Sequence, residues 1–249
     1  MDINKIYLGN CLELMPEIET GSIDMILCDL PYGTTACKWD TIIPFHPLWE
    51  QYKRIIKPNG AIVLFGAEPF SSALRMSNIK NYKYDWIWDK KLSGGFAVAK
   101  YRPLAINENI SVFGRGKITY NPQMLKGKMR VKGRTKNNGI DLSENWKGLK
   151  DGYSTKNDFY FPKTIIEISN ANRRNKLHPT QKPVLLMEYL IKTYTNEGEL
   201  VLDNCIGSGT TAIACLNTKR NFIGMEQEQK YFEIANKRIA DLQSQNVLF

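Results

Sequence analysis

The chain has 249 residues, which is enough for one large domain or for a domain with a substantial insert. Its hydrophobic fraction of 43% and charged fraction of 24% are those of an ordinary globular protein. It contains no apolar run of about 18 residues, so we expect no membrane-spanning helix, and its first ten residues do not resemble a secretory signal. Five cysteines without a Cys-x-x-Cys pair, and only two histidines, argue against a zinc site or a disulfide framework. We therefore expect reduced thiols, a cytoplasmic location and no bound metal.

The net charge of +9 is concentrated in one segment. Residues 114–150 contain ten Lys/Arg and two acidic residues, a balance of +8, whereas the rest of the chain has a balance of only +1. One interpretation is a solvated basic loop. The other is a surface that contacts nucleic-acid phosphates, because clustered Lys and Arg neutralise phosphates and release counterions. The second interpretation selects six residues as nucleic-acid contacts: Lys126, Lys128, Arg130, Lys132, Arg134 and Lys136.

Apolar patterns predict strands and helices that alternate along most of the chain. A short strand and a short helix are predicted within 6–18. The other predicted strands are 22–28, 61–66, 82–90, 110–116, 198–204 and 221–226, and the predicted helices are 45–60, 70–81, 183–195, 210–220 and 229–243. From about 117 to 177 the sequence shows no clear periodicity. The alternation indicates a doubly wound, mostly parallel α/β sheet that is interrupted by a basic, irregular insert.

The stretch "CDLPYG" at 28–33 ends the buried strand 22–28 with an acid, a proline, an aromatic ring and a glycine. That composition is unusual for a plain turn. Because ligands bind at the carboxyl ends of strands in open α/β sheets, this stretch is a candidate ligand site.

The stretch "DNCIGSG" at 203–209 joins the strand 198–204 to the helix at 210. Glycines at such a turn let the backbone approach a ligand and direct free amide groups at it. A P-loop is excluded because its lysine is absent, and Ala212 occupies the last glycine position of a dinucleotide fingerprint. Glu226 ends the next strand, where an acid can bind ribose hydroxyls. These residues favour an adenosine-containing cofactor, with NAD still open and a purely structural turn as the alternative.

Together these motifs resemble those of amino-group DNA methyltransferases. "DLPYG" resembles their D-P-P-Y motif, "HPTQKP" at 178–183 their N-terminal cofactor motif, and "LDNCIGSGTT" their F-x-G-x-G motif. The order, with the catalytic motif before the cofactor motifs, is that of the beta group. The resemblance implies a Rossmann-like fold in three parts: a catalytic half at 1–117, a target-recognition insert at 118–177 and a cofactor-binding half at 178–249.

The resemblance implies transfer of a methyl group from S-adenosylmethionine to the exocyclic amino nitrogen of adenine in double-stranded DNA, with flipping of the base. It assigns the catalytic role to Asp29, Leu30, Pro31 and Tyr32. The carboxylate of Asp29 and the carbonyl of Leu30 would accept hydrogen bonds from the amino group, and Tyr32 would stack on the base. It assigns cofactor binding to Asn10, Asp29, His178, Thr180, Gln181, Lys182, Asp203, Cys205, Gly207, Ser208, Gly209, Thr210 and Glu226.

Three positions depart from the family pattern. Leu30 replaces the first proline of D-P-P-Y but leaves its carbonyl available, Cys205 replaces a phenylalanine, and Asn10 stands where an aspartate near the adenine ring is usual. Two interpretations of Lys38–Trp39–Asp40 stay open, because this segment either orders a loop over the base or has no such role.

Several alternatives remain at this stage. Aspartate in "DLPYG" favours adenine, whereas cytosine-amino enzymes more often carry serine there. An RNA or protein-glutamine methyltransferase and a non-catalytic binding module are further options. The resemblance is also compatible with a homodimer and with a prokaryotic or phage-encoded role in restriction–modification. The DNA sequence recognised cannot be derived from the insert.

Overall fold

The computed structural model describes residues 1–34, 40–94, 96–133, 154–170 and 181–246. The chain divides into two compact units, of which the larger combines Met1–Asn121 with Thr164–Phe249 and the smaller is Pro122–Lys163. The larger unit contains an eight-stranded sheet and the smaller a two-stranded sheet.

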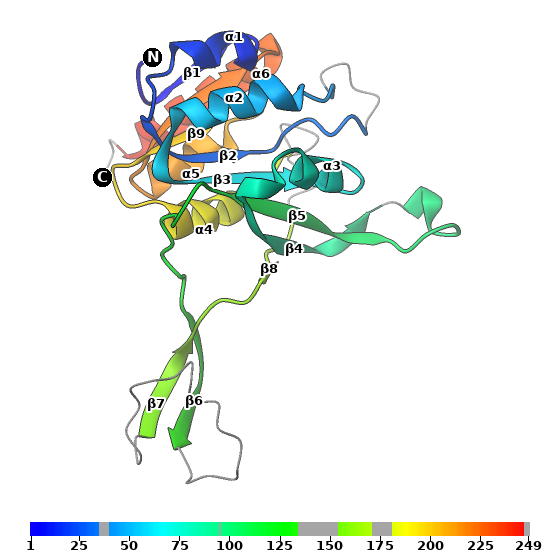
Figure 1. Ribbon diagram of the computed structural model, residues 1–249, viewed down its shortest axis with the longest axis vertical. Helices are drawn as coiled ribbons and strands as arrows, with labels where there is room; N and C mark the ends of the chain where they lie inside the picture. Colours follow the sequence, from blue (N-terminus) through cyan, green and yellow to red (C-terminus); the bar gives the residue numbers. More distant parts are fainter. Residues whose placement is uncertain (35–39, 95, 134–153, 171–180, 247–249) are drawn as a thin grey trace. The chain divides into compact units, whose positions relative to one another are not determined.

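The eight-stranded sheet has the strand order β1-β10-β9-β2-β3-β5-β4-β8 (Figure 1). Its strands are β1 (Lys5–Leu8), β2 (Ile23–Cys28), β3 (Ile56–Gly66), β4 (Tyr82–Gly94), β5 (Ala105–Phe113), β8 (Ile165–Glu167), β9 (Leu200–Asp203) and β10 (Asn221–Glu226). Every neighbouring pair is parallel except the two pairs that β5 makes, with β3 and with β4. The prediction of a mostly parallel α/β sheet is therefore confirmed.

Helices cover both faces of this sheet, and each face has its own hydrophobic core. One face packs against α4 (Val184–Tyr194), α5 (Thr210–Asn217) and α6 (Gln229–Asn246). The other packs against α1 (Cys11–Leu14), α2 (Phe45–Ile55) and α3 (Phe70–Ser77). The short 3-10 turns are η1 (Met15–Glu17), η2 (Ile79–Asn81) and η3 (Phe96–Val98). No helix among the described residues is both long and apolar enough to span a membrane.

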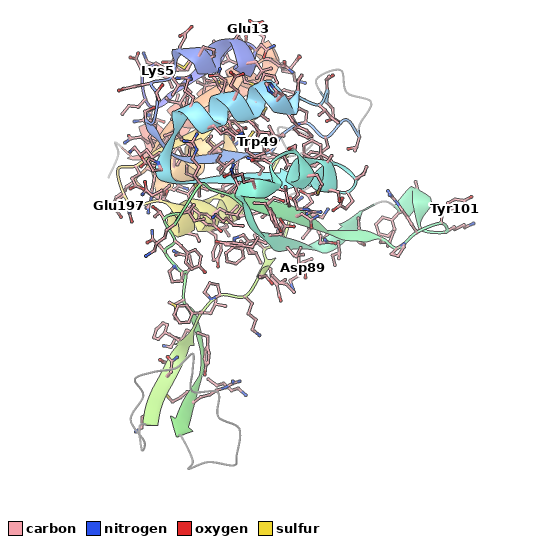
Figure 2. All side chains as sticks on the ribbon, in the orientation of Figure 1. Lys5, Glu13, Trp49, Asp89, Tyr101 and Glu197 are labelled. Atoms are coloured by element: carbon pink, nitrogen blue, oxygen red, sulfur yellow. The ribbon has the colours of Figure 1, made fainter. Side chains whose placement is uncertain are left out.

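Helix α2 shows how the sequence pattern produces this packing. Its apolar side chains recur at helical spacing, and Leu48, Trp49, Tyr52 and Ile55 are all buried. Trp49 points toward the sheet (Figure 2), where its ring centroid lies 4.9 Å from that of Phe113 in β5. The helix ends where the following residue becomes the first of β3.

Strand β2 is buried along its whole length, which explains its nearly continuous apolar sequence. Asp24 is the exception, and each of its carboxylate oxygens accepts a hydrogen bond. It accepts a hydrogen bond from Lys57 Nζ at 2.7 Å and another from the backbone N–H of Leu200 at 3.0 Å. This buried acid therefore ties the start of β2 to β3 and to β9.

The segment from 117 to 177 contains more regular structure than its sequence indicated. In the smaller unit β6 (Leu125–Gly133) pairs with β7 (Ser154–Tyr160) in an antiparallel ribbon. Strand β8 belongs to the larger unit, where it pairs with β4. The expectation of an irregular insert was wrong for these strands. Basic residues at every second position do give β6 a strand period, but Gly127 and Gly133 occupy two of the alternate positions and glycine is rare in strands. Strand β8 is only three residues long. The boundaries 118–177 remain a prediction.

Gly209 is required by close packing as well as by its backbone conformation. It precedes α5 with a φ of +81°, and a Cβ atom there would lie 2.9 Å from Cβ of Ala235 in α6. Gly198 has the same φ of +81° but no atom within 4 Å of such a Cβ. A side chain at Gly198 would cost only backbone strain, whereas a side chain at Gly209 would cost backbone strain and a steric clash with α6.

We predict that Gly209→Ala destabilises the protein more than Gly198→Ala does. Both substitutions carry the left-handed penalty of about 1–2 kcal/mol, and Gly209→Ala adds an overpacking cost of about 1–3 kcal/mol. Urea unfolding of both variants measures the difference. Equal losses would show that α6 relaxes away from the added methyl group at no cost.

Candidate functional site

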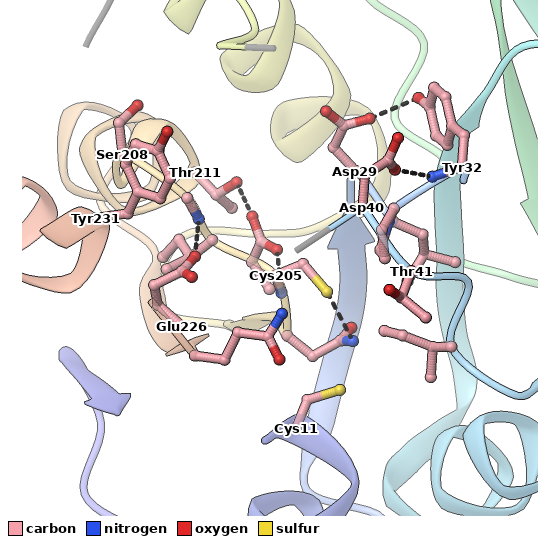
Figure 3. Close-up of a pocket in the computed structure, with 18 of the residues that line it drawn as sticks. Cys11, Asp29, Tyr32, Asp40, Thr41, Cys205, Ser208, Thr211, Glu226 and Tyr231 are labelled. Carbon is pink, nitrogen blue, oxygen red and sulfur yellow. Dashed lines mark hydrogen bonds between the residues drawn. The ribbon is translucent and has the colours of Figure 1, made fainter. Parts of the chain in front are cut away.

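A cavity of about 300 Å³ opens at the carboxyl edge of the sheet. Its walls come from residues that follow four strands: Gly9–Leu12 after β1, Asp29–Tyr32 after β2, 203–208 at the end of β9, and Glu226–Gln227 at the end of β10. Figure 3 shows side chains of these segments facing one another. The two sequence motifs thus line one cavity, as predicted from their positions at strand ends.

Most of the predicted site residues lie in this wall. Those that line the cavity are Asn10, Asp29, Leu30, Pro31, Tyr32, Gln181, Lys182, Asp203, Cys205, Gly207, Ser208, Thr210 and Glu226. Gly209 is not in the lining, and its place is against α6. His178 and Thr180 lie outside the described residues.

Asp29 stands at the end of β2 with both carboxylate oxygens engaged. Its Oδ1 accepts a hydrogen bond from the Tyr32 hydroxyl at 2.6 Å, and its Oδ2 accepts one from Lys182 Nζ at 2.6 Å. Burial raises the pKa of Asp29, although the charge of Lys182 opposes the shift. Because each oxygen accepts one bond and has two lone pairs, each can still accept a hydrogen bond from a ligand.

The ring of Tyr32 is held on one side by Phe70. The two rings are stacked, with centroids 5.0 Å apart and an interplanar angle of 27°. Burial raises the pKa of Tyr32 well above its ordinary value, so the hydroxyl stays protonated and donates to Asp29. Phe70 therefore fixes the orientation of the Tyr32 ring, and Tyr32 also lines the cavity.

Asp40 organises the loop that carries Tyr32. Its Oδ1 accepts a hydrogen bond from the backbone N–H of Tyr32 at 2.8 Å (Figure 3). Oδ1 also accepts one from the N–H of Gly33 at 2.9 Å, and Oδ2 accepts one from the N–H of Thr34 at 2.9 Å. Three backbone donors on one carboxylate fix the path of the chain beyond Asp29. Of the segment Lys38–Trp39–Asp40, only Asp40 lies within the described residues.

The glycine-rich turn after β9 is held from two sides. Gly207 has a φ of +55°, and its N–H donates to Oε2 of Glu226 at 2.9 Å. Arg238 from α6 donates to the Ser208 carbonyl and to the hydroxyls of Ser208 and Thr210, at 3.2 and 3.3 Å respectively. The turn is therefore fixed before any ligand binds.

Glu226 keeps part of its hydrogen-bonding capacity free. Its Oε1 accepts from the N–H of Glu228 at 2.9 Å and its Oε2 from Gly207. Burial raises its pKa, while these amide donors act in the opposite direction. A carboxylate has about four lone-pair sites, so Glu226 can accept two further hydrogen bonds from a pair of hydroxyls.

Asp203 is buried beneath the turn. It accepts hydrogen bonds from the Thr211 hydroxyl and from the N–H of Cys205 at 3.1 Å. Burial raises its pKa to about 7. Asp203 therefore fastens the turn to α5, in addition to lining the cavity.

Neutral groups form the floor of the cavity. Asn204 donates to Sγ of Cys205 at 3.6 Å and accepts from the Tyr52 hydroxyl at 2.6 Å. The Oδ1 atom of Asn10 caps α1 by accepting from the N–H of Leu12 at 2.9 Å. Burial raises the pKa of the nearby Cys28 thiol to about 12, which keeps it protonated. Among the described side chains, no three His, Cys, Asp or Glu residues gather in a metal-binding cluster.

The sequence analysis missed several residues that hold this site. Arg238, Phe70 and Glu108 each act on the cavity across a long distance in sequence, and no local pattern marks them. Asp40 was the exception, because its position soon after "DLPYG" had already suggested a role in ordering a loop.

A family model described as "DNA methylase", of the N6/N4 type, matches residues 23–237. The type II methyltransferase M.HpaI of Haemophilus parainfluenzae is 28% identical over 94% of this chain and 74% of its own length. The type II methyltransferase M1.MboII of Moraxella bovis is 27% identical over 95% of this chain and 96% of its own length.

Solved structures agree with this relationship. The M1.HpyAVI complex with S-adenosylmethionine has a TM-score of 0.63 and 26% identity, and covers 94% of this chain and 98% of that protein. The PvuII cytosine-N4 methyltransferase has a TM-score of 0.66 and 17% identity, and covers 93% of this chain and 84% of that protein. At this identity the similarity supports the fold alone. The chain belongs to the N6/N4 family of DNA methylases, which transfer a methyl group from S-adenosylmethionine to an amino group in DNA.

We predict that Asp40→Asn lowers kcat for methyl transfer by roughly tenfold to a hundredfold, because a displaced catalytic loop costs about that much. The new amide NH₂ would face the N–H of Thr34, where a carboxylate oxygen now accepts. Cofactor affinity, measured by calorimetry, should change much less. Asp241→Asn, at an exposed position of α6, is the matched control. A wild-type kcat in Asp40→Asn would refute the role of Asp40.

Proposed function

We propose that this DNA methylase methylates the N6 amino group of adenine in double-stranded DNA, after rotating the base out of the helix. The observation that carries the proposal is the shared cavity. It contains the Asp29 carboxylate and Leu30 on one side and the turn of Gly207 with Glu226 on the other. An acceptor pair for an amino group and a cradle for an adenosine cofactor are thus close neighbours.

The residues around the glycine turn fit S-adenosylmethionine. Gly207 adopts a left-handed φ that lets the backbone come close to a ligand, and Glu226 has lone pairs for two ribose hydroxyls. In the proposal Asp203, Ser208 and Thr210 border the methionine end. When bound, the cofactor supplies a methyl group that its own sulfonium charge has activated.

The residues of "DLPYG" act on the amino group of the base. Its lone pair is delocalised into the ring, which makes it a poor nucleophile. Hydrogen bonds from its two N–H groups to Asp29 and to the carbonyl of Leu30 would favour a tetrahedral nitrogen with a localised lone pair. Pro31 restricts the backbone between these acceptors and Tyr32. The protein thus contributes alignment and charge.

Tyr32 is proposed to stack on the flipped base. One face of its ring is already covered by Phe70, so the base would complete a stack of three rings on the cavity side. Such stacking helps to offset the few kcal/mol that unstacking a base from the duplex costs.

Cytosine N4 is the alternative target. The PvuII enzyme named as cytosine-N4-specific has the same fold, and the fold does not distinguish the two bases. We favour adenine because the first residue of the motif is Asp29 rather than serine.

We predict that wild-type protein transfers labelled methyl groups to DNA and that digestion of this DNA to nucleosides yields N6-methyl-2′-deoxyadenosine. Asp29→Ala should lower the rate at least about a thousandfold, because it removes a hydrogen-bond acceptor from the reacting nitrogen, while cofactor affinity stays nearly unchanged. Chromatography of the nucleosides measures the product. N4-methylcytosine would refute the adenine assignment, and an active Asp29→Ala variant would refute the role of Asp29.

The ribbon of β6 and β7 is proposed to contact DNA. Lys126, Lys128 and Arg130 are exposed on β6, and the Arg130 guanidinium carbon lies 5.4 Å from the centroid of the Tyr160 ring. For Lys132 only the backbone is described, and Arg134 and Lys136 lie outside the described residues. A two-stranded ribbon fits the major groove of B-DNA, and its basic residues would neutralise phosphates.

We predict that replacing Lys126, Lys128 and Arg130 together with alanine weakens DNA binding and reduces the salt dependence. The slope of log K against log salt should fall by up to about three, since each lost phosphate contact removes about 0.9. Fluorescence anisotropy with duplex DNA measures both effects. Replacing the exposed Lys192, Lys230 and Lys237 of the larger unit is the charge-matched control. An unchanged slope in the ribbon variant would contradict the proposal.

The relatives are type II methyltransferases, which favours a role in restriction–modification. We propose that role, a prokaryotic or phage origin and a cytoplasmic location for this enzyme. A homodimer remains a proposal for sedimentation to test.

A further inference from the structure

Lys182 belongs to the motif assigned to cofactor binding, yet its ion pairs are with Asp29 and Glu108. Its ammonium lies 2.6 Å from Oδ2 of Asp29 and 3.3 Å from Oε2 of Glu108, and its side chain is only 8% exposed. The rings of Phe65 and Tyr32 lie 5.1 and 5.9 Å from the ammonium. Lys182 is therefore a buried cation that is paired with two acids and lies near two aromatic rings.

The two acids bind Lys182 in different ways. Asp29 accepts a hydrogen bond from it, whereas Oε2 of Glu108 receives no hydrogen bond from the described residues despite the short distance. The other oxygen of Glu108 is 3.2 Å from Lys90 Nζ. Glu108 thus acts on Lys182 through charge, while the aligned bond of Lys182 is directed at Asp29.

Positive and negative charges alternate along the cluster, whose members come from four parts of the chain. Lys90 comes from β4, Glu108 from β5, Lys182 from the residues before α4, and Asp29 from the end of β2. Two cations and two carboxylates balance within a site that excludes most water. The charge of Asp29 also contributes to the raised pKa of the nearby Asp203.

This arrangement matters because amino-group activation needs an acceptor. An isolated carboxylate in a buried site becomes protonated, and a protonated acid donates rather than accepts at that oxygen. Burial does raise the pKa of Asp29, and Lys182 is the largest influence that opposes the rise. Burial alone would lower the pKa of Lys182, but Asp29 and Glu108 outweigh it and raise that pKa, so the ammonium keeps its charge.

We propose that Lys182, supported by Glu108, is a positioning residue that holds the Asp29 side chain as a charged acceptor facing the target amino group. The proposal rests on the role given to Asp29 in the proposed function. Lys182 does not touch the reacting atoms in this account. It acts through Asp29. Glu108 helps to keep Lys182 charged, and its own negative charge also raises the pKa of Asp29.

The test is the pH dependence of kcat at saturating DNA and cofactor, in wild type and three variants. Lys182→Met removes the cation, so the acid limb of kcat should move upward by about one to three pH units. Lys182→Arg keeps the charge, so its limb should stay near that of wild type even if kcat falls. Glu108→Gln removes a negative charge beside Asp29, so the acid limb of kcat should move to lower pH. The shift should be about half a pH unit, because Lys90 already offsets the charge of Glu108.

A second readout does not depend on activity. Carbon-13 NMR titration of the Asp29 carboxyl, assigned by its absence in Asp29→Asn, should show the same upward shift in Lys182→Met, the same downward shift in Glu108→Gln and little change in Lys182→Arg. Lys192→Met, at an exposed position of α4, should leave both curves unchanged. If wild type methylates no amino group in DNA, the proposed function fails, and this titration still decides the role of Lys182.

Two outcomes would overturn the proposal. One is a Lys182→Met variant that binds the cofactor more weakly but in which the Asp29 titration is unshifted. That result would show that Lys182 binds the cofactor and does not hold Asp29 in its charged form. If that variant does not fold, Lys182→Gln takes its place, and an unshifted or downward acid limb of kcat in Lys182→Gln would contradict the proposal.

Discussion

The parallel pairing of β2 with β9 joins two parts of the chain that lie about 175 residues apart. Met25 is in register with Val201, and Ile26 is in register with Leu202. The β2–β9 pair lies inside the sheet, with β3 next to β2 and β10 next to β9. Because paired parallel strands end at the same edge, Asp29 and the turn after Asp203 must lie beside each other. The cavity depends on this register, since Asp29 comes directly after the last residue of β2.

Burial then sets the chemical requirements of the site. The same apolar strands that align the two motifs also remove water from their carboxyl ends, which raises the pKa of Asp29 and of Asp203. Hydrogen-bond donors stabilise the charged form of each acid. Lys182 and Tyr32 donate to Asp29, and Thr211 and Cys205 donate to Asp203. Preorganised donors of this kind cost no rearrangement during the reaction.

The sequence predicted the layers of the fold and the walls of the cavity because those features have local patterns. Continuous apolar runs such as 22–28 marked buried strands, and "DLPYG" and "DNCIGSG" marked strand ends. The supporting contacts had no such signal. Glu108 lies on an antiparallel strand, and its meeting with Lys182 depends on the register of β5 against β3 and β4. The ribbon of β6 and β7 was missed because glycines interrupt the alternation in β6 and because β7 is mostly polar.

A crystal structure with S-adenosylhomocysteine would test the central claim most directly, namely that one cavity holds both the methyl donor and the acceptors for the amino group. The account predicts the amino-acid end beside Gly207 and Ser208, the ribose hydroxyls on Glu226, and the sulfur directed toward Asp29. A nucleoside bound against Asp29 and Tyr32, with the sulfur directed away from them, would contradict it.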